Sequence, residues 1–396
     1  MLKRLGLLVL GIIVVSGSSF VALPQQIASV RPPSSFGAPL HGLTPSEQDR
    51  FSIGRDDFEE EETAADGLGP VFNDTSCAAC HSNPTIGGDS NTVETRFGRI
   101  SNNKFDPMTA YGGPLIQSQG IASGGPCSGE TVPPEADYIA DRKTTPLFGL
   151  GLVDNVPDDE FKRIAKIQRE HAPAIAGTLH MVKDVDSGQV KVGRFGWKAQ
   201  VATLRTFSGD AYLNEMGITS PLFPKENAPQ GDASQLTSCD VVKGIEDDGE
   251  GVEAFTDFMM FLGAPPRGPI TPLVQVGDEI FHQIGCAICH YPTLETAPNT
   301  IMALDQVTFH PFSDFLLHDM GELGDSIEQG QAKGSQMRTA PLWGLRERKH
   351  FLHDGRADTI KEAILAHDGQ GQVARNLFLD LSTADMQALI EFLKSL

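Results

Sequence analysis

The chain has 396 residues, of which 31 are Lys or Arg and 52 are Asp or Glu, so its formal net charge is −21. This length allows two or three domains. The acidic excess argues against nucleic acid or an anionic membrane surface as a partner, and it would steer a basic redox protein toward the chain.

The N-terminus is typical of an export signal. Lys3 and Arg4 precede an apolar run at 5–15, and small residues follow at 16–19. The run has the length of a signal-peptide core and is well short of the roughly twenty residues that span a bilayer. We therefore predict a signal peptide over residues 1–22, export to the periplasm and no integral membrane segment, with an uncleaved anchor as the alternative.

The pentapeptide Cys-x-x-Cys-His occurs twice, at residues 77–81 and 286–290. It is the attachment signal of c-type haem, because the two thiols can form thioethers with haem vinyl groups while the His supplies an imidazole to the iron. A thiol-redox or zinc pair is the alternative, which two complete copies in an exported chain disfavour. We predict two covalently bound c-type haems, attached through Cys77, Cys80, Cys286 and Cys289 and ligated by His81 and His290.

Two of the six cysteines remain after the haem sites are assigned, namely Cys127 and Cys239. In an oxidising compartment a leftover pair is most simply a disulfide. Two separate free thiols are the alternative.

The sequence around the two pentapeptides is repeated. FNDTSCAACH matches FHQIGCAICH, which aligns Phe72 with Phe281. Further along, RKTTPLFGLG at 142–151 matches MRTAPLWGLR at 337–346. Such internal similarity indicates that one structural unit is present twice.

The repeat predicts the domain organisation. In each copy a helix follows, with Asp158 and Asp358 as its N-cap, and an amphipathic helix closes the copy. We predict a mainly α fold of two cytochrome c-like helical domains, the first enlarged by a loop-rich insertion. The predicted ranges are 23–42 for an extended lead-in segment, 43–266 for the first domain with its insertion at about 177–250, and 271–396 for the second domain.

The motifs GPVFNDTSCAACH, TTPLFGLGLVDNVPD, GRFGWKAQVATLRTFSGDAYLNEMG, HPFSDFLLHDMG and MRTAPLWGLRERKHFLHDGRA carry a resemblance over nearly the whole mature chain. The chain resembles the bacterial di-haem cytochrome c peroxidase superfamily, and within it the di-haem oxidoreductases also described as thiol oxidoreductases. The resemblance implies that peroxide reacts at the N-terminal haem and that the C-terminal haem feeds electrons to it. We expect a small redox partner of cytochrome c or cupredoxin type. A calcium ion is a further candidate, but no sequence feature supports one.

The second haem has two candidates for its sixth ligand, Met337 and His367. In the superfamily this ligand lies about fourteen residues beyond the His of an FHDG-like motif. That His is His353 here, so the resemblance favours His367 and leaves Met337 to pack against the haem. His353 itself is expected to hold a propionate or the backbone of the pocket, and a helix-capping role is the alternative for His367.

The first haem lacks an equivalent ligand. Aligning the two helices places Gln168 opposite His367 and Arg142 opposite Met337, and neither side chain ligates haem iron. We therefore expect a five-coordinate iron at the first site. His171, one helical turn beyond Gln168, is the rival sixth ligand, and His180 is a weaker one.

Several other side chains are candidates for supporting roles. The distal acid–base group that peroxide cleavage requires could be Glu94 or Glu170. Trp197 could relay electrons between the haems, whereas Trp343 is expected to be packing. The residues expected to pair with haem propionates are Arg96, Arg194, Arg338 and Arg356, and those expected near the haems or in the core are His310, His318 and Met320.

The sequence thus favours an exported di-haem oxidoreductase of the peroxidase type. The first alternative is an electron-transfer cytochrome with two six-coordinate haems and no catalysis. The second is oxidation of thiols, although no further cysteine pair supports it.

Overall fold

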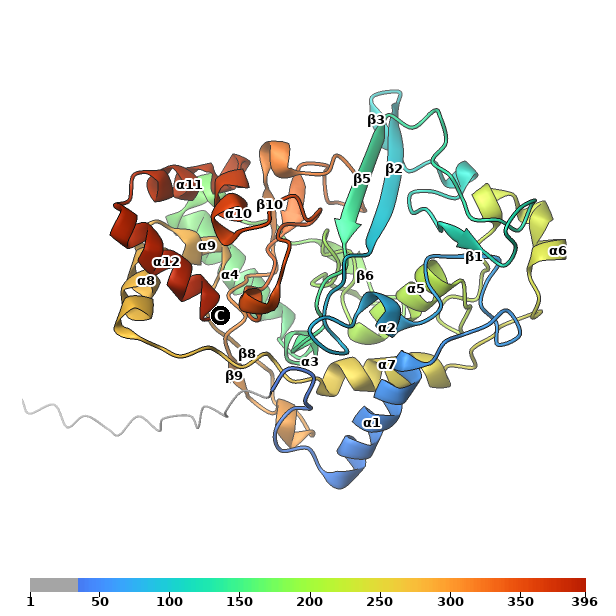
Figure 1. Ribbon diagram of the computed structural model, residues 1–396, viewed down its shortest axis with the longest axis horizontal. Coiled ribbons are helices and arrows are strands. Elements are labelled where there is room, and N and C mark those ends of the chain that lie inside the picture. Colours follow the sequence, from blue (N-terminus) through green and yellow to red (C-terminus); the bar gives the residue numbers. More distant parts are fainter. Residues whose placement is uncertain (1–34) are drawn as a thin grey trace, which may run out of the picture. The chain divides into compact units, whose positions relative to one another are not determined.

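Residues 35–396 are described by the computed structural model of the chain (Figure 1). The predicted signal peptide and most of the predicted lead-in segment lie outside the described residues. Within the described range, 37% of the residues are helical and 14% are in strands. No helix among the described residues is long and apolar enough to cross a membrane.

Helices supply most of the regular structure, which confirms the expected mainly α fold only in part, because the described part of the chain also contains short antiparallel strands that the sequence did not predict. The helices are α1 (Pro45–Glu59), α2 (Cys77–Cys80), α3 (Leu150–Asp154), α4 (Asp158–His171), α5 (Leu204–Met216), α6 (Leu236–Cys239), α7 (Glu250–Phe261), α8 (Pro272–Gln283), α9 (Cys286–Cys289), α10 (Ile360–Ala366), α11 (Gln372–Leu379) and α12 (Thr383–Lys394). The strands are β1 (Val71–Phe72), β2 (Val93–Ser101), β3 (Lys104–Asp106), β4 (Gln119–Gly120), β5 (Tyr138–Lys143), β6 (Met181–Lys183), β7 (Val190–Val192), β8 (Leu294–Glu295), β9 (Thr308–Phe309), β10 (Leu317–Asp319) and β11 (Gln336–Arg338).

The strands form small sheets. β2 is the central strand of a three-stranded sheet in the order β3-β2-β5, and the other strands pair in twos. The register of β2 against β5 places Glu94 opposite Arg142. β10 pairs with β11, which places His318 opposite Met337. Both pairings bring predicted site residues together from distant parts of the sequence.

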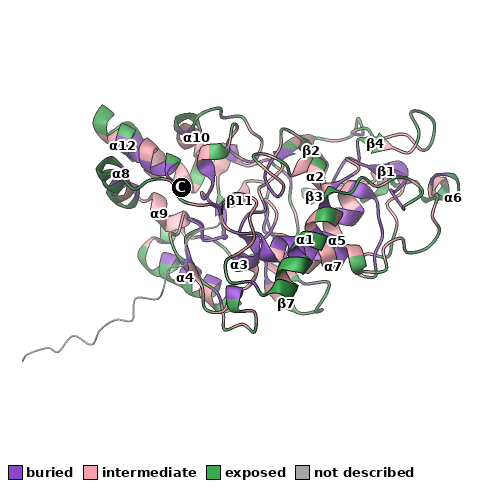
Figure 2. Ribbon diagram, turned by 60° about the horizontal axis from the view of Figure 1, so that its bottom comes forward, coloured by how far each residue is buried: buried purple, intermediate pink, exposed green. Residues whose placement is uncertain are grey.

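Each copy of the repeat contains one closely packed pair of helices, α1 with α7 and α8 with α12. Glycines make the close approach feasible, since a Cβ on Gly54 would lie 2.2 Å from the Ala254 carbonyl oxygen and one on Gly277 would lie 2.1 Å from that of Ala388. Figure 2 shows buried residues concentrated where α1, α5 and α7 meet.

These helix pairs correct the alignment of the repeat. Phe58 in α1 lies with its ring 6.0 Å from that of His81, and Phe281 in α8 lies 6.4 Å from that of His290. Phe58 is therefore the counterpart of Phe281. The alignment with Phe72 was wrong, because Phe72 belongs to β1, in a segment inserted between the first helix and the first motif.

The N-caps differ from the predicted ones by one residue in each copy. α4 is capped by Pro157, so Asp158 is its first residue, where its carboxylate accepts hydrogen bonds from the backbone of Val192 and from Arg194. α10 is capped by Thr359, whose side chain forms a reciprocal capping box with Glu362. Asp358 lies just outside that helix.

The described residues belong to one unit, and the two largest of its four hydrophobic clusters are its main cores. The smaller core consists of residues from the second copy alone. The larger core contains most of the first copy, but it also includes residues from the second copy such as Phe315 and Leu316, against which α4 packs. The division into domains at 266–271 stays a prediction.

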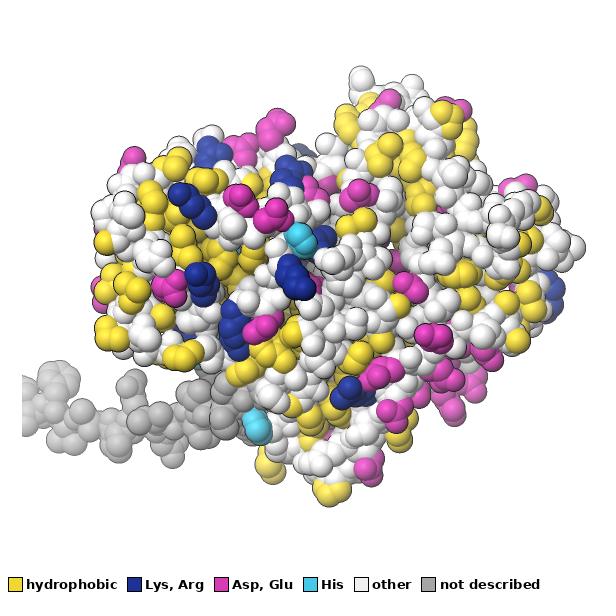
Figure 3. Space-filling view, in the orientation of Figure 1, with side chains coloured by type: hydrophobic (Ala, Val, Ile, Leu, Met, Phe, Trp, Pro, Cys, Tyr) yellow, Lys and Arg dark blue, Asp and Glu magenta, His cyan; other side chains and the backbone are white. Residues whose placement is uncertain are grey.

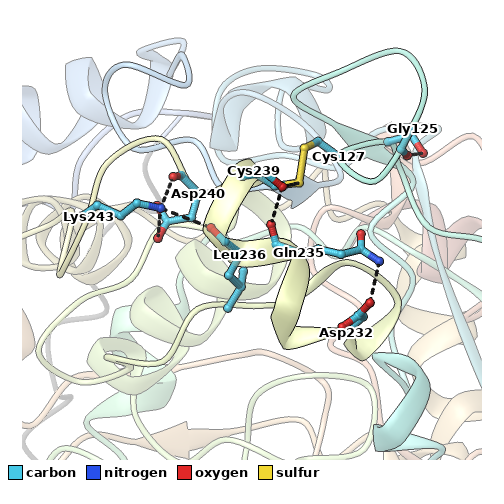
Figure 4. Close-up of a disulfide and its surroundings, with 10 residues drawn as sticks. Gly125, Cys127, Asp232, Gln235, Leu236, Cys239, Asp240 and Lys243 are labelled. Atoms are coloured by element: carbon cyan, nitrogen blue, oxygen red, sulfur yellow. Dashed lines mark hydrogen bonds and ion pairs between the residues drawn. A yellow bond between two sulfur atoms is a disulfide. The ribbon is translucent and has the colours of Figure 1, made fainter.

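A disulfide joins Cys127 to Cys239, as predicted (Figure 4). Cys239 is buried at the end of α6, and Cys127 lies in the loop between β4 and β5. In the chain-entropy model, a crosslink over such a long loop stabilises the folded state by roughly 4–5 kcal/mol. The bond therefore fastens the predicted insertion, which contains the thirteen-residue helix α5 besides loops, to the rest of the first copy.

Candidate haem sites

The two motif helices orient their histidines in the same way. His81 Nδ1 lies 3.1 Å from the Gly88 carbonyl oxygen, and His290 Nδ1 lies 3.1 Å from that of Phe312. A hydrogen bond donated by Nδ1 leaves the Nε2 lone pair available to a metal. Burial lowers the pKa of both imidazoles to about 4, so both are neutral, the form that ligates iron, at pH 7.

At the second motif, His367 faces His290. Their ring centroids are 6.4 Å apart, and His367 Nδ1 lies 2.7 Å from the Ala363 carbonyl oxygen. Two imidazoles on opposite sides of one metal, with metal–nitrogen bonds of about 2.0 Å, have ring centres roughly 6.3 Å apart. The side chains therefore fit a six-coordinate haem iron between His290 and His367. Met337, the other candidate, is buried in β11 opposite His318.

A buried polar network supports the second motif. His318 Nε2 lies 2.9 Å from Asp314 Oδ2, and His318 Nδ1 lies 3.4 Å from Cys289 Sγ. The Asp314 backbone N–H donates to the Cys289 carbonyl oxygen. His318 thus contacts the second haem site, as expected, and Asp314 is a residue that the sequence analysis missed.

Gln168 belongs to this second network. Its amide nitrogen donates to Asp314 Oδ2 and to the Ile288 carbonyl oxygen, both at 2.7 Å. The expectation that Gln168 faces the first haem was wrong. The apolar pattern of α4 aligns with that of α10, but α4 packs against residues of the second copy.

Neither rival histidine of the first site is placed to ligate the first iron. His171 is exposed at the end of α4, the helix whose buried face carries Gln168. His180 is buried, and both of its ring nitrogens are engaged, one with the Lys198 carbonyl oxygen and the other with the Gln331 backbone N–H. Among residues 35–396, no second histidine ring is in contact with the His81 ring.

Ionisable groups from β2 and α5 gather near the first motif. Arg96 Nε lies 2.7 Å from Glu94 Oε1. Asp210 and Glu215 lie on α5, close enough for their charges to act on Arg96. Burial, followed by the charges of Asp74 and Glu215, raises the pKa of the Cys80 thiol, which places Glu215 near the first attachment site. Asp210 and Glu215 were missed because nothing in the sequence pairs them with β2.

The members of this cluster have different proton affinities. Burial raises the pKa of Asp210 to about 6 and that of Glu215 to about 7. Burial alone would also raise the pKa of Glu94, but the ion pair with Arg96 outweighs it and lowers the value. At pH 7 Glu94 and Asp210 are therefore mainly ionised, while Glu215, whose pKa lies near this pH, can hold a proton.

Glu170, the other acid–base candidate, lies away from these groups. It is exposed on α4 and pairs with Lys166 at 3.8 Å. Arg142 is buried and pairs with Asp325 at 2.6 Å, and it lies 3.8 Å from Glu94. Glu94 is thus the one predicted acid–base residue that the structure brings near the first site.

Most of the predicted propionate partners are engaged elsewhere. Arg96 pairs with Glu94, Arg194 with Asp158, and Arg356 with Asp354. Arg338 is buried and bonded only to carbonyl oxygens, those of Gly196 and Thr339. The sequence analysis missed Arg348, whose Nε is buried with no hydrogen-bond partner among the described residues. A cofactor that carries carboxylates fits such unsatisfied guanidinium groups.

The two tryptophans have different surroundings. Trp197 Nε1 donates to the Lys143 carbonyl oxygen, and the backbone N–H of Arg338 donates to the Trp197 carbonyl oxygen. Trp197 therefore touches both copies of the repeat, and its ring centroid lies 6.1 Å from that of buried His353. Trp343 packs against Phe309 within the larger core, as expected.

Comparisons with known proteins agree with a di-haem protein. The family model described as "Di-haem oxidoreductase, putative peroxidase" matches residues 135–396, more than half of the chain. No curated protein matches the chain.

Solved structures with detectable likeness include a hydrazine synthase from Kuenenia stuttgartiensis, at 15% identity and a TM-score of 0.43 over 96% of this chain and all of that one. A MauG-like protein associated with microbial copper homeostasis has 13% identity and a TM-score of 0.41, with 95% of each chain covered. A diheme peroxidase from Burkholderia thailandensis has 14% identity and a TM-score of 0.39, with 89% of this chain and 86% of that one covered. These likenesses are too distant to carry an argument. By its family model, the chain belongs to the di-haem oxidoreductase family.

Proposed function

We propose that the chain is an exported c-type di-haem oxidoreductase of the peroxidase type. The haem at Cys77 and Cys80 would be the reactive centre, and the haem at Cys286 and Cys289 would relay electrons to it. The observation that carries this proposal is the difference between the motifs. A second imidazole faces His290 at 6.4 Å, whereas no histidine ring among the described residues contacts His81.

The residues near the first motif suit the reduction of a peroxide. Bound haem iron would supply an open coordination position and one-electron transfer. Reduction of a peroxide to water or an alcohol consumes two electrons and two protons. Glu94, kept ionised by Arg96, is suited to accept the first proton of the peroxide, and Asp210 and Glu215 are suited to hold and return protons.

Electrons would come from a small redox protein of cytochrome c or cupredoxin type and pass through the second haem. Trp197 is suited to relay them, because it is hydrogen-bonded to both copies of the repeat. Figure 3 shows acidic side chains gathered over α1 and α7, whereas the part around α10 and α12 carries Lys and Arg side chains interspersed with acidic ones. The acidic group over α1 and α7 would orient a basic partner protein on the surface.

The proposal is tested by EPR and optical spectra of the oxidised holoprotein. We expect one high-spin or weakly ligated haem and one low-spin haem, and we expect added peroxide to change only the high-spin signals. The variant His367→Ala should convert the low-spin haem to high spin and leave the first haem unchanged. His282→Ala is the control, since His282 is exposed on α8 and pairs with Asp278.

Two low-spin haems that do not respond to peroxide would refute the proposal and indicate an electron carrier. An unchanged low-spin signal in His367→Ala would exclude His367 as the ligand. Export is tested separately, by locating the processed chain in cell fractions.

A further inference from the structure

A cavity that is open to solvent lies at the junction of the two repeat copies. Its lining includes Thr144 to Pro146 of the first copy and the repeat-equivalent residues Ala340 and Pro341 of the second, together with Trp197. The backbone of Thr145 also contacts His81. The cavity therefore extends from the first haem motif to the second copy.

Three cations that line this cavity have no carboxylate partner. Lys143 and Arg338 are buried, at 9% and 6% exposed. Lys143 Nζ has only the Asn91 side-chain oxygen at 3.5 Å, and Arg348 bonds only to the Pro341 carbonyl oxygen. No carboxylate within the described range lies within ion-pair distance of any of the three. Asp89, which also lines the cavity, acts on Lys143 and Arg348 from further away, and Asp314 acts on Arg338.

Such an arrangement is unfavourable without an anion. Burial, followed by the neighbouring charge of Arg348, lowers the pKa of Arg338 to about 10. A buried charge is costly unless a counter-charge accompanies it. The fourth cation of the lining, Arg194, has such a partner in Asp158. The described lining of the cavity therefore has one carboxylate, Asp89, beyond ion-pair distance, against three cations without a close counter-charge, Lys143, Arg338 and Arg348.

The repeat relates two of these cations to each other. RKTTPLFGLG aligned with MRTAPLWGLR places Lys143 at the position of Arg338. Both also hold Trp197, Lys143 through its carbonyl oxygen at 2.9 Å and Arg338 through its backbone N–H at 2.8 Å. Lys143 is near the first motif, because it precedes Thr144 and Thr145. Arg338 is near the second, because the charge of Asp314 acts on it and Asp314 binds the Cys289 backbone.

We propose that Lys143 and Arg338 are repeat-related binding sites for haem propionates at this shared cavity. Lys143 binds a propionate of the haem attached at the first motif, and Arg338, assisted by Arg348, binds one of the haem attached at the second. The ligand chemistry is that of a carboxylate, which matches ammonium and guanidinium donors. The inference rests on the proposed attachment of one haem to each motif.

A cation beside a propionate favours the reduced haem, which carries one more negative charge than the oxidised haem. Replacing Lys143 by Gln should therefore lower the midpoint potential of the first haem and leave the second nearly unchanged. Arg338→Gln should do the reverse, and Arg348→Gln should resemble Arg338→Gln. We expect about a tenfold fall in the reduction equilibrium constant of the affected haem, equivalent to about 59 mV for one electron.

The measurement is a spectroelectrochemical titration of the holoprotein without peroxide, so it does not depend on catalysis. The two haems are told apart by their absorption bands, and the bands are assigned with His367→Ala. Arg356→Gln is the matched control, because Arg356 is exposed and pairs with Asp354. If both haems are present and their reduction equilibrium constants stay within twofold of wild type in Lys143→Gln and Arg338→Gln, the proposal is overturned.

Exchanged effects, with Lys143→Gln acting on the second haem and Arg338→Gln on the first, would also overturn the assignment. If Arg338→Gln does not mature, Arg338→Lys keeps the charge and should restore both haem content and potential. Failure of Arg338→Lys to do so would show that Arg338 acts through packing alone. If the variants lower the potentials as predicted but the wild-type protein does not react with peroxide, the proposed function is refuted and this inference is supported.

Discussion

At the scale of single residues, Asp210 shows how burial sets a pH dependence. Burial raises its pKa from 3.8 to about 6, and its one side-chain hydrogen bond in the described structure comes from Asn214. The folded protein thus binds this proton more tightly than the unfolded chain does. The contribution of this proton to the stability of the folded state is complete below about pH 4 and is lost as the pH rises through about 6.

We predict that Asp210→Asn removes this dependence. Above pH 7 the variant should have a free energy of unfolding higher than wild type by on the order of 1–2 kcal/mol, and at pH 4 the two should agree. Denaturant unfolding at both pH values measures the difference. Asp159→Asn is the control, because Lys162 lowers the pKa of exposed Asp159 and its removal should not stabilise the protein. A pH-independent difference for Asp210→Asn would contradict the prediction.

At the scale of elements, the two helix pairs depend on one glycine each. Gly277 lets α8 approach α12, and a Cβ at this position would lie 2.1 Å from the Ala388 carbonyl oxygen and 2.6 Å from Phe392 Cβ. The same helix carries Phe281, whose ring lies against those of His290 and Phe392. Packing of this helix pair therefore supports the second haem motif directly.

We predict that Gly277→Ala destabilises the protein by about 1–3 kcal/mol, the usual cost of overpacking. The helix would have to move away from α12, so the low-spin spectrum of the second haem should also broaden or shift. Thermal unfolding and the optical spectrum measure both effects. Val276→Ala, an exposed substitution in the same helix, should leave both unchanged. Equal stability of Gly277→Ala and wild type would show that the contact is easily relieved.

At the scale of the whole molecule, buried charges join the two copies. Asp325 of the second copy pairs with Arg142 of the first copy at 2.6 Å and with Lys198 at 2.8 Å. Lys198 Nζ also donates to backbone carbonyl oxygens in the segment 333–336. Because these groups are nearly inaccessible to solvent, removing one partner would leave an uncompensated charge in the interior. These buried ion pairs therefore link the two copies of the repeat.

We predict that the mature protein carries two covalently bound haems. Mass spectrometry under denaturing conditions should give a mass two haems above that of the chain without its signal peptide. Cys77→Ala with Cys80→Ala should lose one haem and keep the other, since each motif has its own cysteines. A single haem, or none, in wild-type protein produced with c-type maturation would contradict the prediction.

The amino-acid sequence by itself determined the features that depend on short spacing or on elimination. The two pentapeptides each form one short helix with a histidine after it, and the two remaining cysteines form the disulfide. The family followed from motifs spread along the chain. His367 was found through its distance from His353, and the 6.4 Å between the rings of His290 and His367 fits that choice.

Only the tertiary structure decided which side chains meet across long separations. Gln168 bonds to Asp314, 146 residues away, because α4 packs against the second copy. An apolar stripe identifies the buried face of a helix but not the core that receives it. For the same reason the sequence did not predict that Asp210 and Glu215 of α5 lie near Glu94. Lys143 was visible in the repeat opposite Arg338, yet only the folded chain brings both to one cavity.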